Sequence, residues 1–102
     1  MFARLARYTI EPERLGDAIA SFREAGTGLR ELPGFENGYI LVDEEDGALL
    51  TLTLWSTRTT LESSEARASA LRRRATRAAE GSVQSVHCYE VAGELGDRSA
   101  AD

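Results

Sequence analysis

The sequence contains no lysine, a single cysteine and a single histidine among its 102 residues. The absence of lysine excludes a Schiff base on a lysine amine and the phosphate-binding lysine of a P-loop. A lone cysteine, Cys88, cannot form a disulfide within the chain, which fits a reducing compartment. A lone histidine, His87, has no carboxylates in register with it, so we expect no metal site. We also expect no cofactor.

The chain also lacks a long apolar run. No stretch approaches the roughly 18 residues that span a bilayer, and the first ten residues alternate in character, unlike a signal peptide. We therefore expect a cytoplasmic protein. The net charge of −5 disfavours binding to nucleic acid or to an anionic membrane.

Hydrophobic periodicity predicts four strands and two helices. The strands are expected over residues 2–10, 38–43, 48–55 and 83–91, and Asp46-Gly47 supplies a hairpin turn between the middle two. The first helix is predicted from an apolar stripe with helical spacing, formed by Leu15, Ala18, Ile19 and Phe22. It is expected to end at Gly26 and Gly28. A second helix is expected from a Ser56 or Thr57 cap to Glu80.

This order of elements predicts a ferredoxin-like α+β fold, βαββαβ, with two helices on one face of a four-stranded antiparallel sheet. In the third strand, the side expected to meet the helices carries Leu50, Leu52 and Leu54. The opposite side then carries Leu49, Thr51, Thr53 and Trp55. A semi-apolar exposed sheet face usually marks an interface. We therefore expect a homodimer with the two sheets packed face to face.

Four short segments carry a family resemblance. They are Glu11-Pro12, Leu32-Pro33-Gly34-Phe35, Thr53-Leu54-Trp55-Ser56, and the last strand from Ser85 to Val91. Together they resemble the antibiotic-biosynthesis-monooxygenase-like (ABM) domains, which are dimeric α+β barrels. The resemblance covers residues 1–92, expected to form one domain, and residues 93–102 are expected to form a loosely ordered tail. Members of the family include cofactor-free oxygenases of aromatic polyketides, haem-degrading oxygenases and quinol-oxidising proteins.

The residues of this chain match some of these activities less well than others. Haem-degrading members place an Asn late in the first strand and a Trp and a His on the second helix. Here the strand reads Ala6-Arg7-Tyr8 and the helix contains neither residue, which disfavours haem degradation. Cofactor-free polyketide oxygenases use an Asn, a Trp, a Tyr and an Arg around the substrate. The only Asn of this chain, Asn37, is expected in the turn before the second strand.

Aromatic residues are the candidates for holding a planar ring: Trp55, Tyr8, Tyr39 and Tyr89. The indole of Trp55 can stack on a ring and donate one hydrogen bond. The alternative is that Trp55 packs under the second helix or in the dimer core. Cys88 alternates with His87 and is expected to face the helices as an inert buried residue.

Two residues are candidates for catalysis, His87 and Arg7. His87 has an ordinary pKa near neutrality and could act as a general base; the alternative is a hydrogen-bonded residue of the dimer face. Arg4 and Arg7 lie on opposite strand faces, so one of them points inward and needs an anionic partner, unless both reach solvent at the strand end. The arginines of the second helix are interpreted as its solvated face: Arg67, Arg72, Arg73, Arg74 and Arg77.

Two functions follow as hypotheses. The first is a cofactor-independent monooxygenase, or a related enzyme, acting on a small aromatic or quinone-like molecule in a cleft between sheet and helices. The second is a non-catalytic small-molecule-binding or accessory dimeric module of the same fold. A cavity of some hundreds of Å³, lined by Trp55 and an inward Arg or His, would favour the enzyme. A leucine-filled interface would favour the module.

Overall fold

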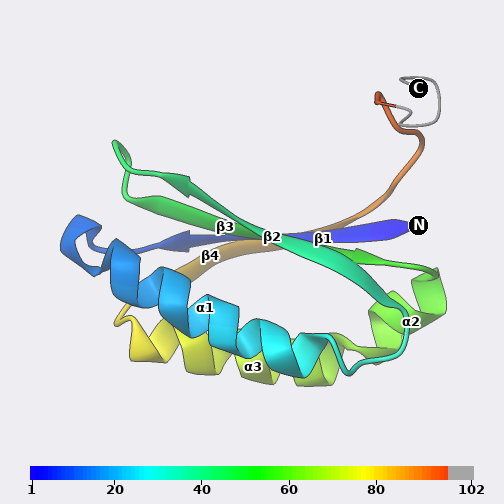
Figure 1. Cartoon of the computed structure of the whole chain (residues 1–102), viewed down its shortest axis with the longest axis horizontal. Coiled ribbons are helices and arrows are strands. Elements are labelled where there is room, and N and C mark those ends of the chain that lie inside the picture. Colours follow the sequence, from blue (N-terminus) through cyan, green and yellow to red (C-terminus); the bar gives the residue numbers. More distant parts are fainter. Residues whose placement is uncertain (97–102) are drawn as a thin grey trace.

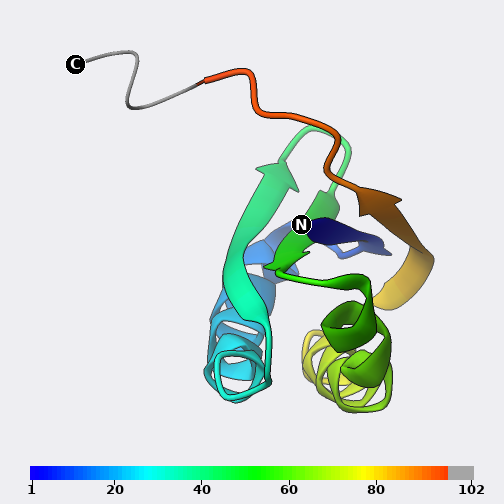
Figure 2. The same ribbon diagram turned by 90° about the vertical axis from the view of Figure 1, so that its right-hand side faces the viewer.

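The computed structural model describes residues 1–96 and confirms the ferredoxin-like α+β fold. Its strands are β1 (Phe2–Thr9), β2 (Phe35–Asp43), β3 (Ala48–Trp55) and β4 (Ser82–Glu90). Its helices are α1 (Leu15–Leu29), α2 (Arg58–Ser63) and α3 (Glu65–Ala78), with a short 3-10 turn, η1 (Pro12–Arg14), before α1. The antiparallel sheet has the order β2-β3-β1-β4, and the helices lie side by side on one of its faces (Figures 1 and 2). Residues 91–96 form neither helix nor strand, and the rest of the expected tail lies outside the described residues.

The predicted hairpin turn is confirmed, but the predicted end of the first helix is wrong. Gly47 closes the hairpin with a φ of +64°, which favours glycine. Helix α1 continues through Gly26 and Gly28 to Leu29. A Cβ atom on Gly28 would lie 3.1 Å from Cδ1 of Leu71, so this glycine allows α1 and α3 to approach closely. The chain reverses instead at Gly34, whose φ is +80°.

The second predicted helix is divided in two. Thr57 caps α2 as expected, and it forms a capping box with Thr60. The break falls at Ser64, between α2 and α3. The side chain of Ser64 donates a hydrogen bond to the carbonyl of Leu61 at 2.7 Å, and Arg4 from β1 donates to the same carbonyl at 2.9 Å. A carbonyl near the end of α2 is therefore satisfied by a side chain from the sheet.

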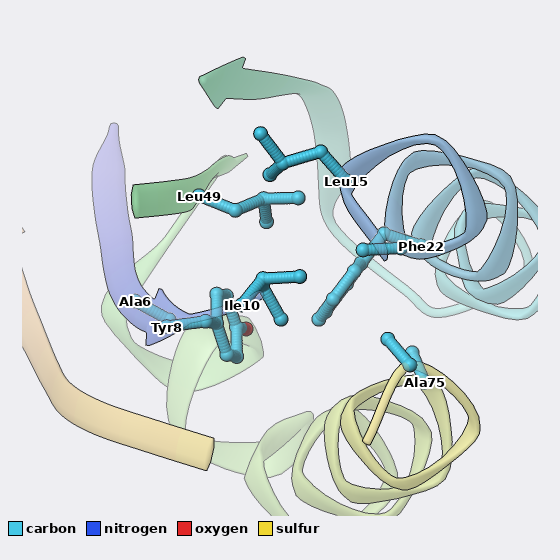
Figure 3. Packing of buried hydrophobic residues seen from close by; sticks show 9 residues of the cluster. Ala6, Tyr8, Ile10, Leu15, Phe22, Leu49 and Ala75 are labelled. Carbon is cyan, nitrogen blue, oxygen red and sulfur yellow. The ribbon is translucent and has the colours of Figure 1, made fainter. Parts of the chain in front are cut away.

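The predicted faces of the third strand are inverted. The side of Leu49, Thr51, Thr53 and Trp55 meets the helices, since Leu49 and Trp55 are both 0% exposed and Leu49 belongs to the core. Figure 3 shows Leu49, Tyr8, Ile10 and Phe22 converging between sheet and helices. The three leucines, Leu50, Leu52 and Leu54, lie on the open face and are partly buried. The more apolar side of β3 is thus turned away from the helices.

The open face of the sheet carries further apolar residues. Tyr39, Leu41 and Tyr89 are exposed on strands β2 and β4, and their register places them on the same side as the β3 leucines. No helix within residues 1–96 covers this face (Figure 1). None of the helices of this part of the chain is long and apolar enough to cross a membrane.

Candidate functional site

A cavity of about 690 Å³ lies between the sheet and helices α1 and α3, in the size range of small-molecule sites. Its apolar walls come from both helices and from β2: Ile19, Phe22, Leu29, Phe35, Ile40 and Leu71. Polar side chains of β1, β3 and α3 also reach it: Arg4, Tyr8, Thr51, Thr53 and Arg72. This composition suits a ring system that carries a few polar substituents.

Tyr8 lies at the centre of the sheet and presents its hydroxyl near the cavity. The hydroxyl lies 3.0 Å from Oγ1 of Thr51, and the ring lies 4.6 Å from the ring of Phe22 (Figure 3). Burial raises the pKa of Tyr8 above its ordinary value of 10.0, against the smaller lowering effects of the Thr51 hydrogen bond and of the Arg72 and Arg4 charges. Tyr8 is therefore a neutral hydrogen-bonding group at physiological pH.

Arg4 is the inward-pointing arginine of β1, with 4% of its side chain exposed. Its guanidinium donates to Ser64 and to the Leu61 carbonyl, and its Nη2 atom lies 2.9 Å from Oε2 of Glu65. The guanidinium carbon also lies 5.5 Å from the ring centre of Trp55. An inward Arg was expected to have an anionic partner, either Glu90 or a substrate carboxylate or phenolate; within the protein, the partner is instead Glu65, from the first turn of α3.

Glu65 binds a second arginine on the same helix. Its Oε1 atom lies 3.2 Å from Nη2 of Arg72, a side chain that is 11% exposed. Arg72 was predicted on the solvated face of the helix, and that prediction is wrong, because Arg72 is directed to the cavity between the layers. The other arginines of this helix are exposed, as expected.

Asn37 and Tyr39 lie together on β2, which begins earlier than predicted. Nδ2 of Asn37 donates a hydrogen bond to the Tyr39 hydroxyl at 3.0 Å. Asn37 pairs with Leu54 and Tyr39 with Leu52, so both side chains lie on the open side of the sheet, and β2 only borders the cavity at these residues. Asn37 therefore belongs to a strand, not to the turn in which the sequence placed it.

Trp55 supports the cavity from behind. Its side chain is fully buried, its Nε1 donates to Thr53 at 3.1 Å, and its ring meets Phe35 edge-on at 5.4 Å between ring centres. Arg4, Thr53 and Phe35 line the cavity, whereas Trp55 does not. In the structure Trp55 is thus a buried packing residue, which was the alternative to a ring-binding role.

The two residues predicted for catalysis lie outside this cavity. Arg7 and His87 are exposed on the open face of the sheet, opposite Tyr8 and Arg4. Tyr89 is exposed on edge strand β4, with its ring 6.4 Å from that of His87. Cys88 shares the helix-facing side of β4 but is exposed, so its predicted burial is wrong. Of the predicted site residues, Tyr8 faces the cavity.

Sequence reasoning missed Arg72 and named Arg4 only as one of two possible inward arginines. A signal existed for Arg4, since the resemblance implied an Arg around the substrate. Arg72 gave none, because its position flanks the helical stripe in the same way as those of its exposed neighbours.

The chemistry available at the cavity is that of hydrogen-bond donors and positive charge. Within residues 1–96, no Asp, Glu, His or Cys lines it, so it holds no side chain that would accept a proton near neutral pH. No group of three or more His, Cys, Asp or Glu side chains in this range could hold a metal ion. The site can therefore bind and stabilise an anion, but it does not offer a general base.

These features define the class of the protein: a ferredoxin-like α+β domain with a ring-sized cavity between its two layers. No protein-family model and no curated protein matches the sequence.

Solved structures give the particular fold. The cofactor-independent oxygenase SnoaB from Streptomyces nogalater is similar over 94% of this chain and 97% of its own, with a TM-score of 0.72 at 14% identity. A candidate antibiotic biosynthesis monooxygenase from Deinococcus radiodurans is similar over 95% and 98%, with a TM-score of 0.74 at 12% identity. One from Chloroflexus aurantiacus is similar over 93% and 96%, with a TM-score of 0.66 at 14% identity. The chain has the ABM fold, as the sequence resemblance implied.

Proposed function

We propose that the protein is a cofactor-independent monooxygenase that oxidises a small aromatic or quinol-like molecule in the cavity between sheet and helices. The observation that carries this proposal is the cavity itself, because it combines aromatic walls with the buried cationic side chain of Arg4. Its Tyr8 and Arg4, with Trp55 behind them, are three of the four residue types that the family resemblance implied around a substrate. The shared fold with SnoaB, a cofactor-independent oxygenase, supports the same reading.

The residues favour a mechanism by stabilisation of an anion. A ring methylene flanked by aromatic and carbonyl groups, as in an anthrone, is acidic, and nearby arginines lower the pKa of such a group. The proton leaves to water, since exposed Arg23 and Arg30 at the cavity's rim place it in reach of solvent. Arg4, Arg72 and the Tyr8 hydroxyl then receive the negative charge, in the manner of an oxyanion hole.

Oxygen chemistry then proceeds from the substrate anion. The anion transfers one electron to dioxygen, and the radical pair combines to form a carbon–oxygen bond. Protonation gives a hydroperoxide, which loses water and leaves a carbonyl. One atom of dioxygen enters the product and the other becomes water, with both C–H bonds of the methylene as the source of electrons. No further reductant is required.

The second candidate is a non-catalytic module that binds a similar molecule. The lack of an acid–base side chain among the cavity residues that the structure describes favours it. It differs from the oxygenase in one outcome, since it binds the ring without consuming oxygen.

Oxygen uptake distinguishes the two. Purified protein, treated with a chelator and free of flavin absorbance, is mixed with anthrone in an oxygen electrode, and the protein-free rate is subtracted. We expect uptake that falls on the order of a hundredfold in Arg72→Met, because a charged donor to the oxyanion is lost. His87→Ala and Arg7→Ala, altered on the opposite sheet face, should keep the wild-type rate. Ligand binding without uptake would favour the module.

We also propose that the protein is a homodimer through the open sheet face. Support comes from the three β3 leucines and from Leu41, Tyr39 and Tyr89, which form an apolar surface without a helix over it in the described part of the chain. Burial of such a face against its copy would extend the modest core of a chain of 102 residues.

A further inference from the structure

Charge is distributed unevenly around the cavity. The whole chain carries 17 acidic and 12 basic residues. The cavity, in contrast, is lined by four arginines, Arg4, Arg23, Arg30 and Arg72, and by no acidic residue of the described part of the chain. A site with one sign of charge in a protein of the opposite sign attracts ligands by focusing its field.

The two inner arginines share a single counter-charge. Glu65 contacts Arg4 through Oε2 and Arg72 through Oε1, at 2.9 and 3.2 Å. Two guanidinium groups and one carboxylate leave one positive charge in excess. Arg23 and Arg30 form no ion pair within residues 1–96, so they add to this positive charge.

Donor groups on these arginines also remain free. Nε of Arg4 is buried without a hydrogen-bond partner, in a side chain that is 4% exposed. Buried N–H groups are nearly always paired in folded proteins, so an unpaired one calls for an acceptor. Arg72 hydrogen-bonds to Glu65 through Nη2 alone among the described residues, although a guanidinium has five N–H donors.

We infer that the cavity takes its ligand as an anion, namely an aromatic molecule that carries one carboxylate or phenolate, with that group held by Arg72 and Arg4. The inference rests on the proposed function, because it names the charge of the molecule that the same cavity receives. The aromatic walls bind the ring, and the one excess charge of the inner arginines, Arg4 and Arg72, matches one anionic group. Glu65 acts as a positioning residue that holds both guanidiniums without entering the cavity.

Two probes of the same shape test this. Naphthoate and naphthamide differ in the charge of one substituent, and neither undergoes the proposed oxidation, so their binding is independent of turnover. Dissociation constants are measured by titration calorimetry at two ionic strengths. We expect naphthoate to bind about tenfold or more tightly than naphthamide, as for hydrogen bonds to a charged group.

Matched variants assign the preference to the site. Arg72→Met should remove most of the difference between the probes, whereas Arg73→Met, at the exposed neighbouring position on α3, should preserve it. Equal affinity for the two probes, binding of neither, or the same loss in Arg73→Met would overturn the inference. A naphthoate preference without oxygen uptake would leave the anion site standing and reject the oxygenase. Oxygen uptake together with equal affinities for the two probes would support the oxygenase and reject the anion site.

Discussion

Arg4 and Glu65 form an ion pair between the first strand and the start of α3, with Nη2 and Oε2 2.9 Å apart. The arginine is 4% exposed and the carboxylate about half exposed. A buried guanidinium needs a counter-charge, and this pair supplies it from the protein surface. The same contact fixes the position of the Arg4 guanidinium beside the cavity.

Neutralising Glu65 should therefore destabilise the fold. In Glu65→Gln the shape is kept, but the buried charge of Arg4 loses its carboxylate, so we expect the free energy of unfolding to fall by about 1–3 kcal/mol. Urea denaturation at neutral pH measures it. Glu31→Gln, at an exposed position, should stay within about 0.5 kcal/mol of wild type. An equal effect of both substitutions would show that the Arg4–Glu65 pair has no special role.

Removing the Tyr8 hydroxyl should have a smaller effect on stability. Tyr8→Phe keeps the packing against Phe22 and breaks the hydrogen bond to Thr51, which should cost about 1 kcal/mol in the free energy of unfolding. Thermal or urea unfolding at neutral pH measures the change. Tyr89→Phe, at an exposed site, serves as the control. A Tyr8→Phe protein as stable as wild type would show that the hydrogen bond between Tyr8 and Thr51 adds no net stability.

Alkaline pH should weaken the fold through Tyr8. The folded pKa is raised above 10.0, mainly by burial, so the folded state holds this proton more tightly than the unfolded state. The contribution is fully present below the unfolded pKa and is lost as pH rises from about 10 through the folded pKa. Urea titrations between about pH 8 and pH 11 should show a steeper loss of stability in wild type and Tyr89→Phe than in Tyr8→Phe. Equal slopes in all three would contradict the raised pKa.

The open sheet face should mediate self-association. Light scattering coupled to size exclusion should give about twice the chain mass of 11.1 kDa. Leu52→Glu places a charge in the middle of this face and should give a protein of single-chain mass with unchanged helical circular dichroism. Ala78→Glu, at an exposed position of α3, should remain dimeric. A wild-type protein of single-chain mass at micromolar concentration would reject the dimer.

The order of elements could be predicted because it depends on local signals. Alternation, the Asp46-Gly47 turn and the Thr57 cap act over a few residues, and all three appear in the structure. The end of α1 could not be predicted in the same way. Gly28 does not stop the helix; it allows α1 to pack closely on Leu71 of α3, a residue far away in the sequence. The break at Ser64 likewise depended on Arg4.

The face of β3 and the site residues were harder to predict for a related reason. Pattern analysis assigns the most apolar side to the core, but here Thr51 and Thr53 face inward because Tyr8 and Trp55 bond their hydroxyls. The covered face brings Arg4 to the cavity and leaves Arg7 and His87 on the open side. Which strand face is covered is a tertiary property, and local periodicity does not encode it.

The most direct test of the proposed chemistry follows the fate of dioxygen. The protein is incubated with anthrone under oxygen-18 gas, and the product is analysed by mass spectrometry with a parallel assay for hydrogen peroxide. A cofactor-independent monooxygenase should place one labelled atom in each quinone formed, release no peroxide, and lose this activity in Arg72→Met but not in His87→Ala. An unlabelled product with an equal amount of peroxide, or no product above the protein-free reaction, would contradict the account.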